Sequence, residues 1–398
     1  MNHQLDAWVR SRAWLATWSL VGLVFRLVLV FRGKGALQYF DEHDYHEIAQ
    51  NLLAGVGFVV RGQHTAFRPP GQPFFLAAVY ACAGPRPLVA EVILALALVP
   101  MAWLIARLAR RFSSEPSARI AGAIAAVHPG LAFSSATLYP AALTALACTV
   151  GVVLFVEALD SGSRVRAAAA GAFLGVAGMA TTYFVPFPLV AGLVAGARRK
   201  VAVAVLVAGV GLAPTGAWLL RNAVVLGTPV LASNGGFNLA LGANDRATAR
   251  SGNWIDPDPI ARGLDTELER DRAYRDLAIA WIREHPGRFF GLAVGRSLAS
   301  LESTALPKTS TGVLRLPGLL AGAVLGAWVL LGVVGLGLVR RRPEAWMVGA
   351  ALGLVVASSA MTISKPRFRF PVDPLLGAFA AHAIERGVTA RRRRQHDP

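Results

Sequence analysis

The sequence predicts an all-α integral membrane protein, a polytopic bundle of about ten transmembrane helices. Two observations come from composition: 55% of the 398 residues are hydrophobic against 16% charged, and the mean hydropathy is +0.50. A water-soluble globule of this size could not bury so much apolar surface. The third observation is that apolar runs recur at lengths of roughly 17 to 25 residues, which suffices to cross a bilayer. We therefore treat residues 1–398 as a single membrane domain.

The apolar runs give the candidate spans in order. They cover 14–31, 87–106, 118–134, 138–158, 167–183, 184–197, 201–220, 316–339, 345–363 and 372–388. The first run is too long for a signal-peptide core and has no small-residue cleavage site behind it, so we expect a retained span. Pro186 and Pro188 predict two short helices in 167–197, because proline interrupts helices. Arg26 lies inside the first span and is expected to face the bundle, where it could pair with a carboxylate.

The basic residues predict the orientation. The formal net charge is +17, but the arginines occur in short clusters between apolar spans, which is typical of topology signals and not of a nucleic-acid-binding face. The clusters are Arg10 and Arg12; Arg107, Arg110, Arg111 and Arg119; Arg164 and Arg166; Arg198, Arg199 and Lys200; Arg340 to Arg342; and Arg391 to Arg394. These clusters predict that both termini, including the basic tail 389–398, lie in the cytoplasm. The membrane that holds the protein is then the inner or plasma membrane of the cell. Segments 32–86, 221–315 and 364–371 are then extracytoplasmic.

The first extracytoplasmic segment carries the densest acidic and histidine cluster, residues 39–49. A polytopic membrane protein places such a cluster at the membrane surface mainly when chemistry takes place there. A helix with an apolar stripe is expected in the same stretch, ended by Gly55 and Gly57 and lying on the membrane. The stripe consists of Tyr45, Ile48, Ala49, Leu52 and Leu53.

The other two extracytoplasmic segments are polar or basic. In 221–315, turns rich in Gly and Asn precede a helix that starts at Thr266, where Glu269 completes capping-box spacing, and that ends at His285-Pro286. Its apolar stripe is Tyr274, Leu277, Ala278 and Trp281. The third segment brings Lys365, Arg367 and Arg369 within five residues at the membrane surface.

These motifs together resemble the bacterial polyprenyl-phosphate-dependent glycosyltransferases of family 39. Those proteins are GT-C-fold relatives of the protein O-mannosyltransferases and the lipid A aminoarabinose transferases. The matching pieces are Phe40-Asp41-Glu42, Tyr45, Ile48-Ala49, Asn51-Leu52, Gly55, Gly57-Phe58, Phe67-Arg68-Pro69-Pro70-Gly71-Gln72-Pro73-Phe74, Arg221-Asn222 with Gly227, Asn234-Gly235-Gly236, Leu241-Gly242-Ala243-Asn244, His285-Pro286 and Arg367-Phe368-Arg369-Phe370-Pro371. Their order and side of the membrane carry the likeness, which extends from about residue 13 to 387.

The resemblance implies transfer of one sugar from a polyprenyl phosphate to a cell-envelope acceptor, with inversion, on the extracytoplasmic face. The acceptor would be a lipid, a protein or a glycan. The aspartate of the family's first loop is the catalytic base, and Asp41 occupies that place, with Glu42 as its neighbour. An acceptor hydroxyl or amine needs such a carboxylate to take its proton. The alternative is that Asp41 or Asp44 only caps the helix; we assign the cap to Asp44 and the catalytic role to Asp41.

Arginine and lysine side chains suit the negative charge of a departing phosphate. The candidates are Arg68, Arg221, Lys365, Arg367 and Arg369. For each, the alternative is a snorkelling interfacial cation. The substrate pocket is expected to include Tyr45, Asn234, Asn238 and Asn244.

No cofactor is expected. His43 and His46, with Asp44 and Glu47, could form a metal site, but such histidines are ordinary near headgroups and no further cluster lies close in sequence. The second extracytoplasmic loop, residues 135–141, lacks the acidic residue that many relatives carry, which counts against a mechanism that uses a metal or two carboxylates.

Two other functions remain open. A transporter or lipid flippase would need polar groups near mid-membrane and an inverted repeat, and the spans are nearly uncharged apart from Arg26. A catalytically silent scaffold fits the missing second-loop acid, but it would have no reason to gather Asp41 and the cations around one pocket. The sugar and the acceptor cannot be read from the loops.

Overall fold

The structure is a computed structural model that describes residue 9 and residues 11–250, 263–302 and 315–396. Within these residues the chain is almost entirely helical, and the one sheet is a two-stranded hairpin. The expected all-α membrane fold class is confirmed. Arg10 and the stretches 251–262 and 303–314 of the second long segment lie outside the described residues.

The helices follow the apolar runs. The first part of the chain forms α2 (Arg12–Gly33), α3 (Phe40–Leu53), β1 (Val59–Val60), β2 (Gln63–His64), α4 (Gly71–Ala83), α5 (Pro87–Ala97), α6 (Met101–Ala109), α7 (Glu115–Ala126), α8 (Pro129–Ser135) and α9 (Ala141–Ser161). The second part forms α10 (Arg164–Ala180), η1 (Thr182–Phe184), α11 (Phe187–Ala197), α12 (Val201–Leu226), α13 (Gly235–Gly242), α15 (Glu267–Glu284), α16 (Pro286–Leu301), α17 (Arg315–Leu338), α18 (Pro343–Met361), η2 (Pro366–Phe368) and α19 (Asp373–His396). Each expected span overlaps a helix or a pair of helices.

Prolines decide where two of the spans break. The span 118–134 divides into α7 and α8 at His128-Pro129, because Pro129 lacks the N–H that would continue the first helix and instead starts the second. The expected interruption at Pro186 and Pro188 is confirmed, since α11 begins only after η1.

Five stretches of the described residues are long and apolar enough to cross a membrane, so the protein is a multi-pass membrane protein. They are Ala13–Gly33, Pro87–Ala109, Ala141–Ser161, Val201–Leu226 and Pro343–Met361. Shorter apolar helices include Gly71–Ala83, which lies within the segment we expected to be a loop. The count of about ten crossings stays a prediction.

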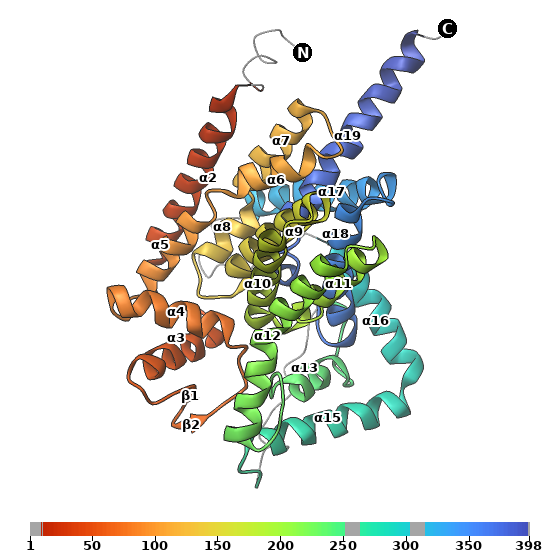
Figure 1. Cartoon of the computed structure of the whole chain (residues 1–398). Helices are drawn as coiled ribbons and strands as arrows, with labels where there is room; N and C mark the ends of the chain where they lie inside the picture. Colours follow the sequence, from red (N-terminus) through yellow and green to blue (C-terminus); the bar gives the residue numbers. More distant parts are fainter. Residues whose placement is uncertain (1–8, 10, 251–262, 303–314, 397–398) are drawn as a thin grey trace.

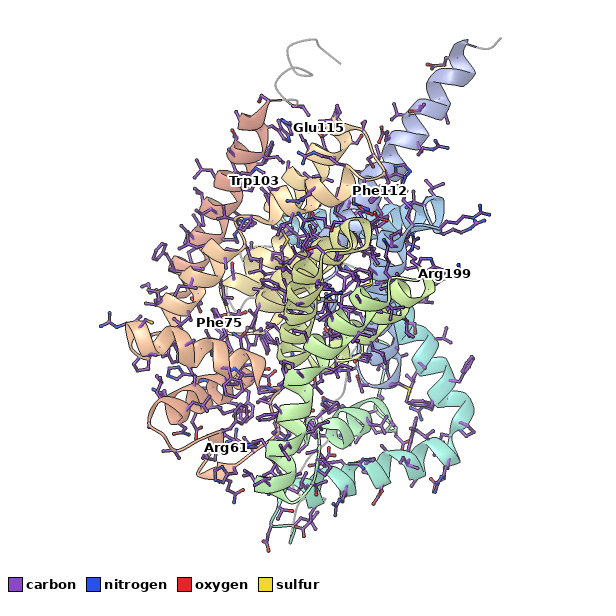
Figure 2. The ribbon with its side chains drawn as sticks, viewed as in Figure 1. Arg61, Phe75, Trp103, Phe112, Glu115 and Arg199 are labelled. Atoms are coloured by element: carbon purple, nitrogen blue, oxygen red, sulfur yellow. The ribbon has the colours of Figure 1, made fainter. Side chains whose placement is uncertain are left out.

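The two ends of the bundle differ in what they hold. The start of α2 and the end of α19 lie at one end, whereas α3, the β1–β2 hairpin, α13 and α15 lie at the other (Figure 1). Glu115 and Arg61 mark these two ends when the side chains are drawn (Figure 2). The described parts of the segments 32–86 and 221–315 therefore meet at one end, as expected for loops on a common side. Which side faces the cytoplasm stays a prediction.

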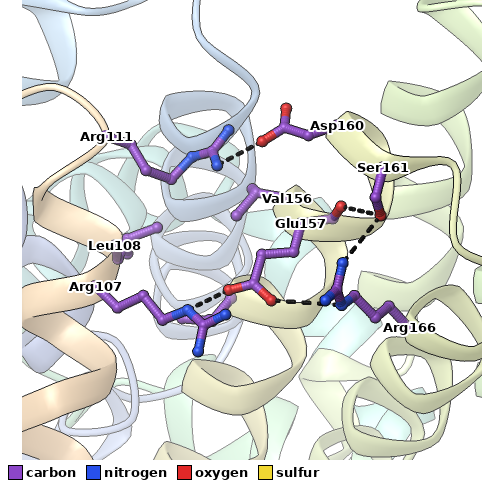
Figure 3. A pocket seen from close by; sticks show the side chains of 9 residues that line it. Arg107, Leu108, Arg111, Val156, Glu157, Asp160, Ser161 and Arg166 are labelled. Atoms are coloured by element: carbon purple, nitrogen blue, oxygen red, sulfur yellow. Dashed lines mark hydrogen bonds and ion pairs between the residues drawn. The ribbon is translucent and has the colours of Figure 1, made fainter.

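The end that holds α7 contains a cleft of 320 Å³ between α6, α9 and α10 (Figure 3). Charged side chains line it in pairs. Arg107 Nε lies 2.5 Å from Glu157 Oε1, and Arg166 Nε lies 3.8 Å from Glu157 Oε2. Arg111 pairs with Asp160 at 2.6 Å and also with the buried Glu344 of α18. These pairs join four helices at their polar ends.

Small residues allow the helices of the core to approach closely. The main cluster of buried side chains runs from α5 and α6 through α9, α10 and α11 to α18 and α19. A Cβ added to Gly175 of α10 would lie 2.6 Å from the carbonyl oxygen of Gly211 in α12, so only glycine permits this contact. Arg26 also faces the bundle, as expected. It is 1% exposed, and its Nη1 donates to the Ala126 carbonyl oxygen at 2.8 Å rather than to a carboxylate.

The helix expected in the first long segment is present as α3, but its apolar stripe packs mainly against the protein rather than facing lipid. Tyr45, Ile48 and Ala49 are buried inside the protein. Tyr45 and Ala49 pack with α4, which we had not foreseen, and Ile48 packs against Phe58 at the base of the hairpin. The apolar stripe thus fixes α3 to the bundle.

The helix of the second long segment is present where it was predicted, but Leu277 of its expected apolar stripe is 45% exposed. Thr266 accepts from the Glu269 N–H and Glu269 accepts from the Thr266 N–H, so the capping box is confirmed at the start of α15. Tyr274, Ala278 and Trp281 are buried against α13. The helix ends at Glu284, directly before His285 and Pro286.

Candidate active site

The β1–β2 hairpin is the platform on which the site is built. Its two-residue turn places Arg61 at φ 50° and Gly62 at φ 75°, the left-handed pair that tight hairpins require. An arginine rarely adopts this conformation. Arg61 is held in it by two carboxylates of α3, since its N–H donates to Glu47 Oε1 at 2.6 Å and its guanidinium to Asp44 Oδ1 at 2.7 Å.

Arg221 of α12 clamps the base of the hairpin. Its Nη1 donates to the Thr65 carbonyl at 2.9 Å and its Nη2 to the Phe58 carbonyl at 3.2 Å. The guanidinium also lies over the rings of Phe58 and Trp218, at 5.6 and 5.0 Å from their centroids. Arg221 was expected to bind the donor phosphate. Among the described residues, however, its N–H groups are largely engaged with the hairpin.

The second long segment holds the same strand end from the other side. Glu267, in the first turn of α15, accepts from Thr65 Oγ1 and from the Ala66 N–H, both at 2.7 Å. Asn234 donates to the Phe67 carbonyl at 2.8 Å. The residues just before Arg68 are thus fixed by contacts from α12, α13 and α15, and this explains how the two segments form one surface.

Glu42 is the residue that caps α3, so our assignment of the cap to Asp44 was wrong. The helix begins after Tyr39, and Glu42 at the third position accepts from the N–H groups of Gln38 and Tyr39, both at 2.8 Å. Its other oxygen accepts from the Leu138 N–H of the second loop at 2.7 Å. Burial raises the pKa of the Glu42 carboxyl, although these three donors stabilise its charged form.

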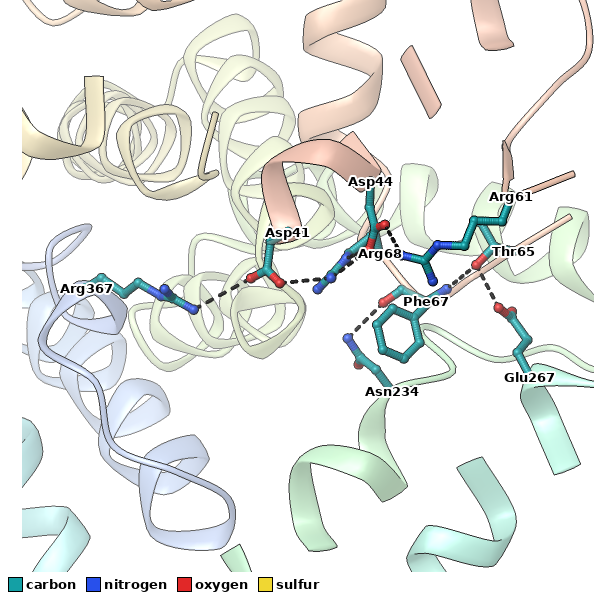
Figure 4. Close-up of polar contacts among 9 residues, drawn as sticks. All are labelled: Asp41, Asp44, Arg61, Thr65, Phe67, Arg68, Asn234, Glu267 and Arg367. Atoms are coloured by element: carbon teal, nitrogen blue, oxygen red, sulfur yellow. Dashed lines mark hydrogen bonds and ion pairs between the residues drawn. The ribbon is translucent and has the colours of Figure 1, made fainter. Parts of the chain in front are cut away.

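Arg68 joins the two aspartates of α3 (Figure 4). Its Nε and Nη2 donate to Asp44 Oδ2 at 2.9 and 2.7 Å, and its Nη2 lies 2.8 Å from Asp41 Oδ1. The side chain is only 10% exposed and is flanked by the rings of Tyr45 and Phe67. An arginine with this many partners sets the position of Asp41. Gly71 helps to place Arg68, because it lets the chain just after this arginine approach the end of α10 closely. A Cβ on Gly71 would lie 2.5 Å from the Ala180 backbone N.

Arg367 approaches Asp41 from the opposite side, on the loop between α18 and α19 (Figure 4). Its Nη2 lies 3.6 Å from Asp41 Oδ2, beyond hydrogen-bonding distance. The guanidinium is 4.2 Å from the centroid of the Tyr139 ring. Asp41 and Arg367 are 26% and 30% exposed, so both can meet a ligand. Lys365 lies near, and burial together with the charge of Arg367 lowers its pKa.

Arg369, two residues further on, is buried instead. It pairs with Asp373 at 2.6 Å, and its Nη1 donates to the carbonyls of Ser300 and Glu302. It is 1% exposed. Its role in the described residues is to fix the loop to α16 and α19, and of the three cations expected here Arg367 lies beside Asp41, while Lys365 lies close to Arg367.

An apolar groove of 730 Å³ lies beside the platform. Side chains from α3, α4, α9, α10 and α12 line it, with Arg221 at its polar end. Those from α4 and α12 include Phe74, Phe75 and Trp218. The wall of the groove is therefore hydrocarbon-like, and its cation, Arg221, is already engaged with the hairpin carbonyls.

The remaining expected residues divide into two groups. Tyr45 contributes its ring below Arg68, and burial raises the pKa of its hydroxyl to about 12. Asn238 lies half-buried on α13, whereas the Asn244 amide caps that helix by donating to the Ala240 and Leu241 carbonyls. The role of these residues in a substrate pocket stays a prediction.

Within the described ranges, no group of three or more His, Cys, Asp and Glu side chains is placed to hold a metal ion. Nδ1 of His46 lies 2.8 Å from the Tyr80 hydroxyl, and burial together with His43 lowers its pKa. Independence from metal stays a prediction.

Two residues of the site were missed from the sequence. Tyr139 supports Arg367 from the second loop, which we had read only for its lack of an acid. Arg61 pairs with Asp44 from the hairpin turn. No signal in the sequence indicates the first contact, because it joins segments far apart in the chain. The second was open to prediction, since a short hairpin brings its turn back over the preceding helix.

Comparison with known proteins places the fold. No family model matches the sequence, and no curated protein does. Among solved structures, the oligosaccharyltransferase of Archaeoglobus fulgidus in its apo form is similar, with a TM-score of 0.53, 15% identity, 97% of this chain covered and 52% of that one. An oligosaccharyltransferase AglB from the same organism, in complex with an inhibitory peptide and a dolichol-phosphate, gives a TM-score of 0.50 at 16% identity, over 94% of this chain and 50% of that one.

The chain has the GT-C fold. ArnT from Cupriavidus metallidurans bound to undecaprenyl phosphate also aligns, over 93% of this chain and 78% of that one at 15% identity, with a lower TM-score of 0.46. The present chain spans about half the length of the archaeal structures it matches. The likeness covers the arrangement of helices, and the glycosyltransferase family number stays a prediction.

Proposed function

We propose that this protein transfers a single sugar from a polyprenyl-phosphate donor to an extracytoplasmic cell-envelope acceptor, with inversion at the anomeric carbon. The observation that carries the proposal is the placement of Asp41. One of its oxygens is fixed by Arg68, and the other lies on the exposed side, 3.6 Å from Arg367 of the basic loop, which also carries Lys365. A scaffold would have no need of this arrangement.

The reaction follows from the groups present. The acceptor O–H or N–H attacks the anomeric carbon, and its proton passes to Asp41. The bond between that carbon and the phosphate oxygen breaks through an oxocarbenium-like transition state, and its electron pair leaves with the phosphate. Arg367 and Lys365 stabilise the growing negative charge of the leaving phosphate, because cations aimed at developing charge act most strongly where water is partly excluded.

The apolar groove supports a lipid-linked donor. We assign it to the hydrocarbon chain, since aromatic and aliphatic side chains line it and Arg221 stands at its polar end. An archaeal protein of the same fold has been solved with a dolichol-phosphate. Substituting Val176 of the groove by Trp should weaken use of a long-chain donor more than use of a short-chain one.

The test is a transfer assay with purified protein in lipid nanodiscs. We expect activity with an extract of polyprenyl-phosphate-linked sugars, none with nucleotide sugars when polyprenyl phosphate is absent, and little effect of a chelator. Activity with a nucleotide sugar in the absence of any polyprenyl phosphate would overturn the proposal. Loss of activity in EDTA that a divalent ion restores would instead revive the His43 and His46 metal site. Mass spectrometry of a deletion strain should show accumulated donor and a missing glycosyl residue.

A further inference from the structure

Arg367 differs from the other arginines near Asp41 in how it is held. The backbone that follows it is fixed, because Tyr183 Oη donates to the Phe368 carbonyl at 2.7 Å and Arg369 is buried in its ion pair with Asp373. The Arg367 side chain, by contrast, rests on the Tyr139 ring and stands 3.6 Å from Asp41. Its guanidinium can therefore change partner by rotation of the side chain while the loop stays in place.

Arg68 has no such freedom. It holds Asp44 through two hydrogen bonds while it contacts Asp41, and it is 10% exposed. If Arg68 left Asp44, that buried carboxylate would keep only the exposed Arg61 as its ion-pair partner, which is costly. Of the two cations on Asp41, only Arg367 can be withdrawn by an incoming anion.

A phosphate is the stronger partner for such an arginine. Arginine and phosphate form paired, charge-assisted hydrogen bonds at about 2.7–2.9 Å, shorter and stronger than a contact near 3.6 Å. Lys365 adds a second cation to the same loop and repels Arg367 until an anion arrives between them. The surplus of positive charge favours a phosphate over the single carboxylate oxygen of Asp41.

We propose that Arg367 is shared between Asp41 and the donor phosphate. With the donor site empty, Arg367 lies against Asp41 Oδ2; when the donor binds, Arg367 turns to the phosphate and leaves that oxygen free to accept the proton of the acceptor. This step rests on the proposed function and adds an order to it, because the base becomes available only after the donor is bound. No proton moves in the exchange itself: one ion pair replaces another.

The exchange has a measurable consequence: the negative charge of Asp41 should weaken phosphate binding although turnover requires it. If Asp41 competes with phosphate for Arg367, then removing the Asp41 charge tightens phosphate binding while it abolishes turnover. The experiment measures binding of a polyprenyl monophosphate to the full-length protein in nanodiscs, for wild type, Asp41→Asn, Arg367→Gln and the double variant. We expect Asp41→Asn to bind about threefold tighter or more, in line with couplings between contacting charges. In the Arg367→Gln background the same change should have no effect.

Asp44→Asn is the matched control. It removes one carboxylate from the same helix, but Asp44 contacts Arg68 and Arg61 and not Arg367. Its effect on phosphate binding should be equal with and without Arg367. If Asp41 and Asp44 show equal coupling to Arg367, the effect comes from the overall electrostatic field of the site. That result would overturn the proposal that Arg367 is shared between Asp41 and the phosphate. Asp41→Ala serves if the Asn variant does not keep the wild-type melting temperature.

The remaining outcomes separate this step from the function on which it rests. Weaker or unchanged phosphate binding in both Asp41 variants overturns the exchange and leaves the glycosyltransferase reaction standing. If the wild-type protein does not bind the polyprenyl monophosphate at all, the proposed donor class is wrong and the exchange falls with it.

Discussion

Two clusters of arginines and carboxylates lie at opposite ends of the bundle, and they differ in how completely the charges are matched. At the cleft of Figure 3 three arginines meet two carboxylates, and a third carboxylate pairs with one of these arginines from α18. The members are Arg107, Arg111 and Arg166 with Glu157, Asp160 and Glu344. Each group has a partner of opposite sign, and the pairs tie helix ends together.

The cluster around Asp41 has more cations than carboxylates. Three arginines contact two acids, Arg61, Arg68 and Arg367 with Asp41 and Asp44, and Lys365 adds a further cation close to Arg367. One contact, between Arg367 and Asp41, is long, and both side chains are partly exposed. The comparison of the two clusters shows that an excess of positive charge over carboxylates, rather than the presence of charged residues alone, indicates a binding site for an ionic ligand.

The largest difference between the clusters should appear in turnover. Asp41→Asn keeps the shape of the side chain and removes the proton acceptor, so turnover should fall about a hundredfold or more. Glu157→Gln makes the same chemical change in the matched cluster, where exposed ion pairs contribute little, and should leave turnover within about twofold. The transfer assay measures both. A similar loss in the two variants would remove the distinction, and full activity of Asp41→Asn with loss in Glu42→Gln would move the base to Glu42.

Stability should respond in the opposite way. Glu344 is fully buried against Arg111, so Glu344→Gln removes a charged hydrogen bond and should cost about 1–3 kcal/mol of unfolding free energy. Arg367→Gln relieves repulsion with Lys365 and should leave the melting temperature equal or higher, while it weakens donor binding. Thermal unfolding in one detergent compares them. Destabilisation by Arg367→Gln as large as that by Glu344→Gln would show that Arg367 is structural.

The smallest effect is expected in the pH dependence. Because burial and Arg367 lower the pKa of Lys365, this lysine loses its proton below the ordinary value of about 10.4. Polyprenyl monophosphate binding should therefore weaken as the pH rises through the lowered pKa. The contribution of Lys365 to stability has the other sign: the unfolded chain binds more protons between the two pKa values, so stability increases with pH in that window.

Lys365→Arg is the control for this profile, since arginine stays charged over the whole range. Its donor binding should be flat where that of wild type declines. The same decline in both proteins would show that Lys365 does not face the phosphate.

Sequence and structure contributed differently to the candidate site. Asp41 and the basic segment 365–369 were both predicted to take part, because acids and cations at the surface of an apolar bundle have few structural reasons to be there. The sequence could not distinguish Arg367 from Arg369. The two arginines lie two residues apart in the same loop. Only the packing of α19 buries Arg369 against Asp373 and leaves Arg367 beside Asp41.

The assignment of the helix cap shows the same limit. The acidic run 41–47 offers several spacings that fit a cap. Glu42 takes that role because the second loop presents the Leu138 N–H to its other oxygen, a contact across 96 residues of sequence. Asp44 is then free to face Arg68 and Arg61.

The sequence by itself determined the class of this protein, the positions of its main apolar spans and the start of α15, since burial in lipid demands long apolar runs and a capping box follows local spacing where one candidate is present. The tertiary structure alone decided which charged side chains meet. Ion pairs between distant segments depend on how the helices pack, and packing at close approach is set by contacts such as that of Gly175 with Gly211. The meeting of Asp41, Arg68 and Arg367 is of this kind: the first two come from the segment 32–86 and the third from the segment 364–371, and no local rule of sequence links them.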